Sequence, residues 1–196
     1  VTGVQTCALP ISPQDMVFVP AARFTMQLEH IRRECGCYPD PGTPPEEQLH
    51  FLQGWDFSKP MQHAAGPLDV DAFYIDETEV TNAQYKAFLD ATGYAPRHPD
   101  NFLKHWPNGN MPQELAEHPV VYVDIDDARA YARWAGKRLP TEEEWHLAAQ
   151  ATDGRMWPWG PEFDEKRVNV TGAPMPVRSL PEGRSPYGCY HMSGNV

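Results

Sequence analysis

Residues 136–145 read GKRLPTEEEW, and this stretch predicts the junction between two helices. Gly136 predicts the end of the first helix, because glycine readily adopts the left-handed conformation that closes a helix. Thr141 predicts the N-cap of the second helix, and Glu144 completes a capping box, in which each side chain bonds to the other residue's backbone N–H. The three acids suit the positive end of a helix, so they need no catalytic role. We expect Arg138 to pair with one of these carboxylates as a structural clamp.

Two more helices are predicted upstream of this junction. Thr81 and Gln84 form a second capping box, and Gly93 predicts the end of that helix. Asp124 predicts the N-cap of the other helix, with Asp127 in its first turn. Apolar side chains at three- and four-residue spacing predict the buried faces. They are Tyr85, Phe88 and Leu89 in the first helix, Ala128, Tyr131, Ala132, Trp134 and Ala135 in the second, and Trp145, Ala148 and Ala149 in the third.

Short apolar runs predict the strands. They lie at residues 16–20, around Phe24 and Met26, at residues 70–75 and at residues 120–123. The chain contains 21 Pro residues, which resist the interiors of helices and strands. Residues 27–68 are predicted to be irregular, either as a long loop laid over the core or as a mobile insertion. Helices and strands do not alternate as β-α-β units, so the predicted class is α+β, loop-rich and low in regular secondary structure.

Charge and hydropathy exclude several classes of partner. The formal net charge is −11, which argues against binding to nucleic acid, where Lys and Arg must neutralise phosphates. The same charge argues against an anionic membrane surface. No apolar run approaches the roughly 20 residues of a membrane-spanning helix. We therefore expect no nucleic-acid partner and no membrane span.

The first residues differ from the rest of the chain. Residues 1–11 carry no charge and do not match a secretory signal, which would begin with basic residues and contain a longer apolar block. Back-translated, they resemble a common sequencing adapter. We therefore interpret residues 1–12 as a non-native segment and residues 13–196 as one domain.

Cysteine and histidine residues do not form a recognisable metal motif. Cys35 and Cys37 are separated by one residue, closer than in the usual zinc knuckle, so we interpret them as ordinary loop thiols. His98 and His105 lie in one predicted loop; they could share a metal, or they could be solvated loop residues. The sequence contains no Gly-rich phosphate loop, no G-x-S-x-G elbow and no H-E-x-x-H pair. Taken alone, these residues display no active site.

Five segments resemble, in their order and spacing, the sulfatase-modifying factor family, which includes the formylglycine-generating enzymes. They are MVFVPAARFTM (16–26), DAFYIDETEVTNAQYKAFL (71–89), HPVVYVDIDDARAYARWAGKRLPTEEEWHLAA (118–149), WPWG (157–160) and RSPYGCYHMSGNV (184–196). The resemblance implies a loop-rich α+β fold related to C-type lectins. It also implies an oxygen-dependent oxidase that converts a cysteine of a protein substrate to formylglycine with a copper ion held by two cysteines.

The resemblance places that cysteine pair after Val196. We therefore expect no catalytic residue in this chain, which would be a divergent member truncated at its C-terminal end and inactive by itself. Cys189 stands where the family usually has an apolar residue, so we expect it to be a buried small hydrophobe.

The resemblance also implies two partial calcium sites. Asn169 and the carbonyl of Val170 match part of one, and the carbonyls of Gly194 and Val196 match part of the other. Both matches are incomplete. The loop that should carry the acidic ligand of the first site is short here. In the second site His191 replaces an Asn or Asp, and imidazole is a poor ligand for an oxygen-seeking cation.

Two other functions remain open. One is a non-catalytic binding module, because lectin-like folds often present loops to sugars or peptides. The other is an iron-dependent sulfoxide synthase of the ergothioneine type, although the sequence shows no H-x-x-x-H-x-E motif. For an oxidase, the expected partner is a protein or peptide substrate resembling a sulfatase.

Overall fold

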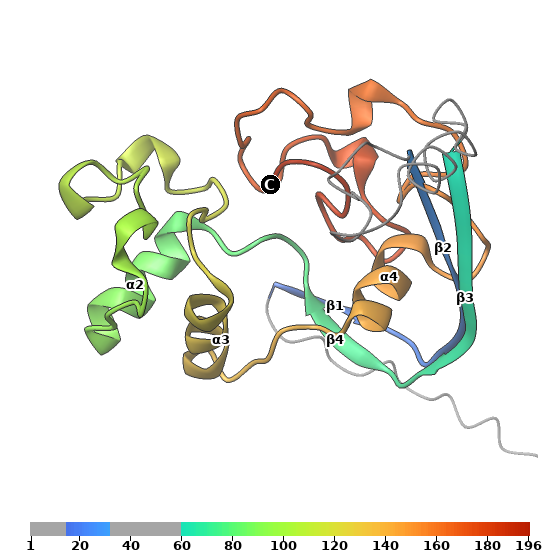
Figure 1. The fold of residues 1–196 in the computed structure, drawn as a ribbon, viewed down its shortest axis with the longest axis horizontal. Helices are drawn as coiled ribbons and strands as arrows, with labels where there is room; N and C mark the ends of the chain where they lie inside the picture. Colours follow the sequence, from blue (N-terminus) through green and yellow to red (C-terminus); the bar gives the residue numbers. More distant parts are fainter. Residues whose placement is uncertain (1–14, 32–59) are drawn as a thin grey trace, which may run out of the picture.

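The computed structural model describes residues 15–31 and 60–196. Figure 1 shows two groups of elements, with helices α2 (Asn82–Thr92) and α3 (Ile125–Trp134) on one side. Strands β2 (Ala22–Ile31) and β3 (Pro60–Val70) form a long hairpin on the other side, packed against helix α4 (Glu142–Gln150). Strands β1 (Met16–Val19) and β4 (Phe73–Asp76) lead from this group towards α2 and α3. Short elements and long irregular connections confirm the predicted α+β class.

Single-turn 3-10 helices interrupt the irregular connections. They are Pro99–Asn101, Pro107–Gly109, Gln113–Leu115, Glu165–Arg167 and Pro181–Gly183. Three of them begin with proline, whose fixed φ suits the first helical position. None of the helices in the described part of the chain is both long and apolar enough to cross a membrane.

The described strands form two antiparallel pairs. Strand β1 pairs with β4, with Met16 opposite Asp76 and Val19 opposite Phe73. Strand β2 pairs with β3, and its register shifts between Phe24 and Met26. The chain passes from β1 to β2 after Val19 and returns from β3 to β4 before Phe73. The two strand pairs therefore join where β1 and β3 end and β2 and β4 begin. Residues 70–75, predicted as a single strand, are therefore split between β3 and β4.

The prediction that residues 27–68 are irregular was wrong at both ends, where residues 27–31 and 60–68 belong to β2 and β3. The middle of that segment lies outside the described residues. Pro60, Gly66 and Pro67 hid the strand from the sequence pattern. Gly66 is needed there, because a Cβ atom would lie 2.9 Å from the Phe24 carbonyl oxygen at the register shift. The hairpin is also held by Gln150 of α4, whose Nε2 donates to the Gln27 carbonyl over 2.7 Å.

The three α-helices begin at the capping residues that the sequence predicted. Thr81, Asp124 and Thr141 are the N-caps of α2, α3 and α4, and each forms a reciprocal capping box with the residue three positions later. Gly93 ends α2 in the left-handed conformation, with φ 62°. These local signals needed no tertiary information, because each depends on residues within one helical turn.

The core consists of two clusters. One joins β1, the hairpin, α4 and the C-terminal segment around Val19, Leu147 and Cys189, and Cys189 is fully buried as predicted. The other joins α2 and α3 with the 94–123 connection around Tyr85 and Phe88. Both of these aromatic residues are buried, as predicted.

The predicted burial of Trp134 and Trp145 was wrong, because they are 44% and 38% exposed. Trp134 occupies the last position of α3 and packs against the edge of the second cluster, with its ring centroid 5.7 Å from that of Phe88. Trp145 lines a cavity that helical periodicity cannot reveal. The predicted strand at 120–123 is also absent, since Tyr122 has a φ of 58°, which interrupts an extended backbone.

Candidate functional site

A cavity of about 480 Å³ opens between the two groups of elements. We call it the central cavity. Its walls come from β4, residues 78–80, the C-terminal part of α3, residues 136–140, the start of α4 and residues 190–192. Phe73, Ile75, Tyr131, Leu139 and Trp145 provide much of its apolar surface. A concave, mostly apolar site with a few polar groups is the usual form of a ligand-binding pocket.

Glu79 is the most perturbed polar group of this cavity. It lies two residues before the N-cap of α2, and its Oε1 accepts a hydrogen bond from Asn195 Nδ2 over 2.9 Å. Its Oε2 is buried and has no hydrogen-bond partner among the described residues. Burial raises the pKa of Glu79 to about 7, and the bond from Asn195 only partly opposes this effect. Glu79 therefore gains and loses a proton near neutral pH.

His191 lines the same cavity. Its ring bonds to the backbone of Pro176, which has only a carbonyl to offer, so the ring nitrogen in that bond is the donor. The other nitrogen, Nε2, is buried and has no hydrogen-bond partner among the described residues. Burial lowers the pKa of His191, which favours the neutral ring. A neutral imidazole and a carboxyl group that titrates near pH 7 thus face one cavity.

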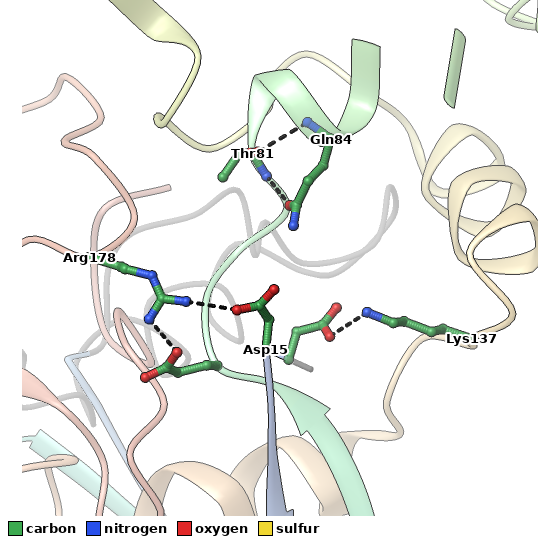
Figure 2. Close-up of polar contacts among 7 residues, drawn as sticks. Asp15, Thr81, Gln84, Lys137 and Arg178 are labelled. Atoms are coloured by element: carbon green, nitrogen blue, oxygen red, sulfur yellow. Dashed lines mark hydrogen bonds and ion pairs between the residues drawn. The ribbon is translucent and has the colours of Figure 1, made fainter. Parts of the chain in front are cut away.

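The remaining charges of the cavity are paired. Lys137 Nζ lies 2.6 Å from Asp76 Oδ1, and this contact ties the segment after α3 to the end of β4 (Figure 2). Arg138 pairs with Glu144, as predicted for a clamp, through two hydrogen bonds. Because these cations have their own carboxylates, they do not neutralise Glu79.

A second ion-pair group fixes the edge of the site. Figure 2 shows the guanidinium of Arg178 between Asp15 and a second carboxylate, which belongs to Glu77. The Tyr190 N–H also donates to the Glu77 carbonyl over 2.8 Å. These contacts join the start of β1, the end of β4 and the C-terminal segment, and so hold residues 190–192 against the cavity.

Asn195 connects the cavity to the predicted calcium residues. Its Oδ1 accepts from Asn169 Nδ2 and from the Met175 backbone N–H, both over 2.8 Å, while its Nδ2 donates to Glu79. Gly194 lies directly against Asn169, because a Cβ atom there would be 2.6 Å from the Asn169 carbonyl oxygen. The structure thus brings two of the four predicted calcium residues, Asn169 and Gly194, together.

The other two predicted calcium residues, Val170 and Val196, are exposed to solvent. The side-chain oxygen of Asn169 accepts hydrogen bonds from the backbone N–H and the hydroxyl of Thr171, over 3.1 and 2.8 Å. The amide oxygen is therefore already engaged with protein donors. Calcium at these positions stays a prediction.

The described residues do not offer a copper site of the expected kind. Cu(I) selects thiolates, but Cys189 is the one cysteine in residues 15–31 and 60–196, and burial raises its pKa to about 11. Cys35 and Cys37 lie outside the described residues. No group of three His, Cys, Asp or Glu side chains within the described ranges is arranged to hold a metal. His105 bonds through Nε2 to Asn82 Oδ1 over 2.9 Å, which makes it part of the α2 packing.

Glu79 and His191 were not predicted as site residues. Glu79 appeared in the sequence only as part of a motif before a helix, and His191 only as an unsuitable calcium ligand. The available signal was an acid immediately before Val80 and the capped start of α2, but Asp76 and Glu77 precede it closely and the sequence does not distinguish the three. Recognising it required knowing that residues 190–195 fold back against it, a contact that spans 116 positions between Glu79 and Asn195.

Comparison with known proteins shows what this chain is similar to. A formylglycine-generating enzyme from Thermomonospora curvata is 34% identical over 174 residues, which cover 63% of this chain and 57% of the relative. The "Inactive C-alpha-formylglycine-generating enzyme 2" of Bos taurus is 42% identical over 102 residues, covering 45% of this chain and 34% of the relative. The structure of PvdO from Pseudomonas aeruginosa matches with a TM-score of 0.57 at 25% identity, covering 92% of this chain and 67% of that one.

The matches cover only part of the length of the relatives. This chain spans about half the length of the curated formylglycine-generating enzymes that it matches, 54% and 57% for two of them. The family model described as "Sulfatase-modifying factor enzyme 1-like domain" matches residues 5–196. Since that match includes nearly every residue, the chain belongs to the sulfatase-modifying factor enzyme 1-like family.

Proposed function

We propose that the protein containing this chain is an oxygen-dependent oxidase that converts a cysteine of a protein or peptide substrate to formylglycine. Family membership and the similarity to formylglycine-generating enzymes support this activity. The observation that supports it in this chain is the position of Glu79, a partly buried carboxyl group with a pKa of about 7 in the wall of the central cavity.

The proposed role of Glu79 is proton transfer. A substrate thiol must lose its proton before it can act as a thiolate, and a general base works best when its pKa lies near the working pH. Asn195 fixes one carboxyl oxygen of Glu79, so the second oxygen remains to exchange the proton. Tyr131, Leu139 and Trp145 line the same cavity, so this carboxyl group lies in a largely apolar site.

The activity is tested with the protein translated from the complete open reading frame. It is incubated with Cu(I), oxygen and a Cys-containing sulfatase peptide, and aldehyde is measured by mass spectrometry. We expect aldehyde from the complete protein and none from residues 1–196 alone. No aldehyde from the complete protein, under conditions in which the peptide binds, would contradict the oxidase.

The role of Glu79 is tested in the same assay. Glu79→Gln should lower kcat/KM by about 100-fold, in the range typical for removal of a general base. The control is Glu114→Gln, which makes the same change at an exposed carboxylate that does not line the cavity. An equal loss in both variants would reject proton transfer by Glu79.

A non-catalytic binding module is the second candidate. It is favoured by the 42% identity to a relative whose name describes it as inactive. In that case the complete protein would bind the peptide without forming aldehyde, and Glu79→Gln would change the binding constant. Fluorescence polarisation with the labelled peptide, measured beside the aldehyde assay, separates the two functions.

A further inference from the structure

A second hollow of about 420 Å³ lies along α3 and the segment that follows it towards α4. We call it the α3 groove. It shares the 137–140 segment with the central cavity but extends along α3 to Ile125. Four basic side chains line it, and none of its lining residues is acidic. These are Arg129, Arg133, Lys137 and Arg138.

The positive charge of the α3 groove is only partly neutralised. Lys137 and Arg138 have close carboxylate partners at 2.6 and 2.5 Å. Arg129 has a looser contact with Asp126 at 3.6 Å, between two exposed side chains, and such pairs contribute little. Within residues 15–31 and 60–196, Arg133 has no ion-pair partner. Arg133 and Arg129 are therefore able to engage an outside anion.

The groove also has an apolar end. Ile125 is the first residue of α3 and is 55% exposed. Spacings of four and eight residues put Ile125, Arg129 and Arg133 on the same side of the helix. Leu139 and Pro140 form the facing wall. An exposed isoleucine in line with a loosely paired and an unpaired arginine favours an interaction surface over a purely solvated face.

The charge of the whole chain makes this surface distinctive. The formal net charge is −11, so an acidic partner is repelled by most of the molecule and attracted only where basic side chains gather. Arginine binds carboxylates through two parallel hydrogen bonds, so the acidic side chains of a protein partner suit this surface. A neighbouring apolar residue of the partner would cover Ile125.

We propose that the α3 groove binds an acidic peptide segment of a partner protein, with carboxylates at Arg129 and Arg133 and an apolar side chain at Ile125. This inference is independent of the proposed oxidase activity. Because residues 137–140 separate the groove from the central cavity, a bound segment would lie next to that cavity without entering it.

Fluorescence polarisation of the chain with a labelled short peptide tests the proposal. The probe consists of Glu and Asp residues around one central Leu. Two control peptides replace the Leu by Ser or the acids by Lys. We expect the acidic Leu peptide to bind, the Ser peptide to bind several-fold more weakly, and the Lys peptide not to bind to the α3 groove. Equal binding of the Leu and Ser peptides would overturn the apolar contact.

Charge reversal locates the site. Arg133→Glu should weaken binding of the acidic Leu peptide by at least about tenfold, as expected for loss of a charge-assisted contact. The control Arg23→Glu makes the same charge change at an exposed arginine of β2, whose contact with Asp69 at 3.8 Å is loose. It should change binding less than about twofold. Circular dichroism confirms that both variants fold, since both arginines are exposed.

Two results would overturn the proposal. Equal weakening by Arg133→Glu and Arg23→Glu would show that only the net charge matters. Unchanged binding in Arg133→Glu would place the peptide elsewhere. Ile125→Ser gives an independent check, because this exposed residue can be replaced without opening the core. The variant should weaken binding of the Leu peptide more than binding of the Ser peptide.

Discussion

Arg138 and Glu144 join the two ends of the turn between α3 and α4 through parallel hydrogen bonds. Nη1 donates to Oε2 over 2.6 Å, and Nη2 donates to Oε1 over 2.5 Å. Glu144 also accepts from the Thr141 backbone N–H over 2.8 Å, so one carboxylate serves the ion pair and the helix cap. The Glu144 side chain is only 12% exposed, whereas that of Arg138 is 64% exposed.

The first prediction concerns the stability provided by this pair. Glu144→Ala should lower the free energy of unfolding by about 2 kcal/mol, because it removes a charge-assisted pair and half of a capping box. Glu143→Ala should lower the unfolding midpoint much less, because Glu143 suits the positive end of the helix but is not part of the Arg138 clamp. Urea denaturation followed by circular dichroism measures both. Equal effects would mean that general helix charge, not the clamp, stabilises the junction.

The same pair predicts how stability changes with acid. Hydrogen bonding to Arg138 lowers the pKa of Glu144 below the ordinary value of 4.5. Its folded pKa is therefore below its unfolded pKa, and its stabilisation is present above pH 4.5 and lost as the pH falls through the folded pKa. Glu144→Gln should weaken the loss of stability below pH 4.5. Unfolding midpoints measured between about pH 3 and pH 6 test this, and an unchanged slope would contradict it.

The sequence allowed the helix starts and the α+β class to be predicted because their signals are local. A cap such as Thr141 and its partner Glu144 lie within one turn, so their geometry follows from spacing alone. Strand β3 was missed because Pro60 and Gly66 are breakers in most strands. They are tolerated here because β2 and β3 form a two-stranded pair. The register shift in that pair requires a residue without a side chain at Gly66.

The site was less predictable than the fold because it is assembled from distant segments. Periodicity assigned Trp145 to the buried face of α4, but it could not show that a cavity opens there and leaves the side chain 38% exposed. The perturbed state of Glu79 depends on burial by residues far along the chain, and the contact with Asn195 is the clearest example. A sequence pattern records the identity of these residues but not their desolvation.

The third prediction separates the core from the cavity wall on helix α4. Leu147 is fully buried, so Leu147→Ala should cost about 3 kcal/mol through lost burial and an unfilled cavity. Trp145 is 38% exposed and already borders an open space, so Trp145→Ala should cost about 1–2 kcal/mol despite its larger side chain. Chemical denaturation gives both values. A larger loss in the Trp145 variant would mean that the cavity is closed in solution.

The fourth prediction concerns Gly194, which has a φ of 75° and lies against Asn169. Gly194→Ala should lower the free energy of unfolding by about 3 kcal/mol, through left-handed strain and a Cβ atom forced against backbone. Gly172→Ala is the control, because its φ is 84° but a Cβ atom there would have no neighbour within 4 Å. It should cost only about 1 kcal/mol. Similar losses would show that the C-terminal segment can move away from Asn169.

The fifth prediction follows from the raised pKa of Glu79. Burial raises that pKa from 4.5 to about 7, so the folded protein holds this proton more tightly than the unfolded chain does. The contribution of Glu79 to the free energy of unfolding is therefore greatest below pH 4.5 and decreases as the pH rises from 4.5 to 7. After allowance for screening by solvent, the difference between pH 4.5 and pH 8 should be roughly 2 kcal/mol.

Glu79→Gln replaces the carboxyl group by an amide of similar shape that cannot ionise, and its carbonyl oxygen can still accept from Asn195 Nδ2. The variant should gain stability relative to the wild type at pH 8 and show little difference near pH 5. Unfolding free energies measured at both pH values test this, with Glu114→Gln at an exposed carboxylate as the control that should not remove the pH dependence. If the Glu79→Gln advantage at pH 8 is absent, Glu79 is solvated and ionised in the folded protein, and its proposed role as a base at neutral pH loses its physical support.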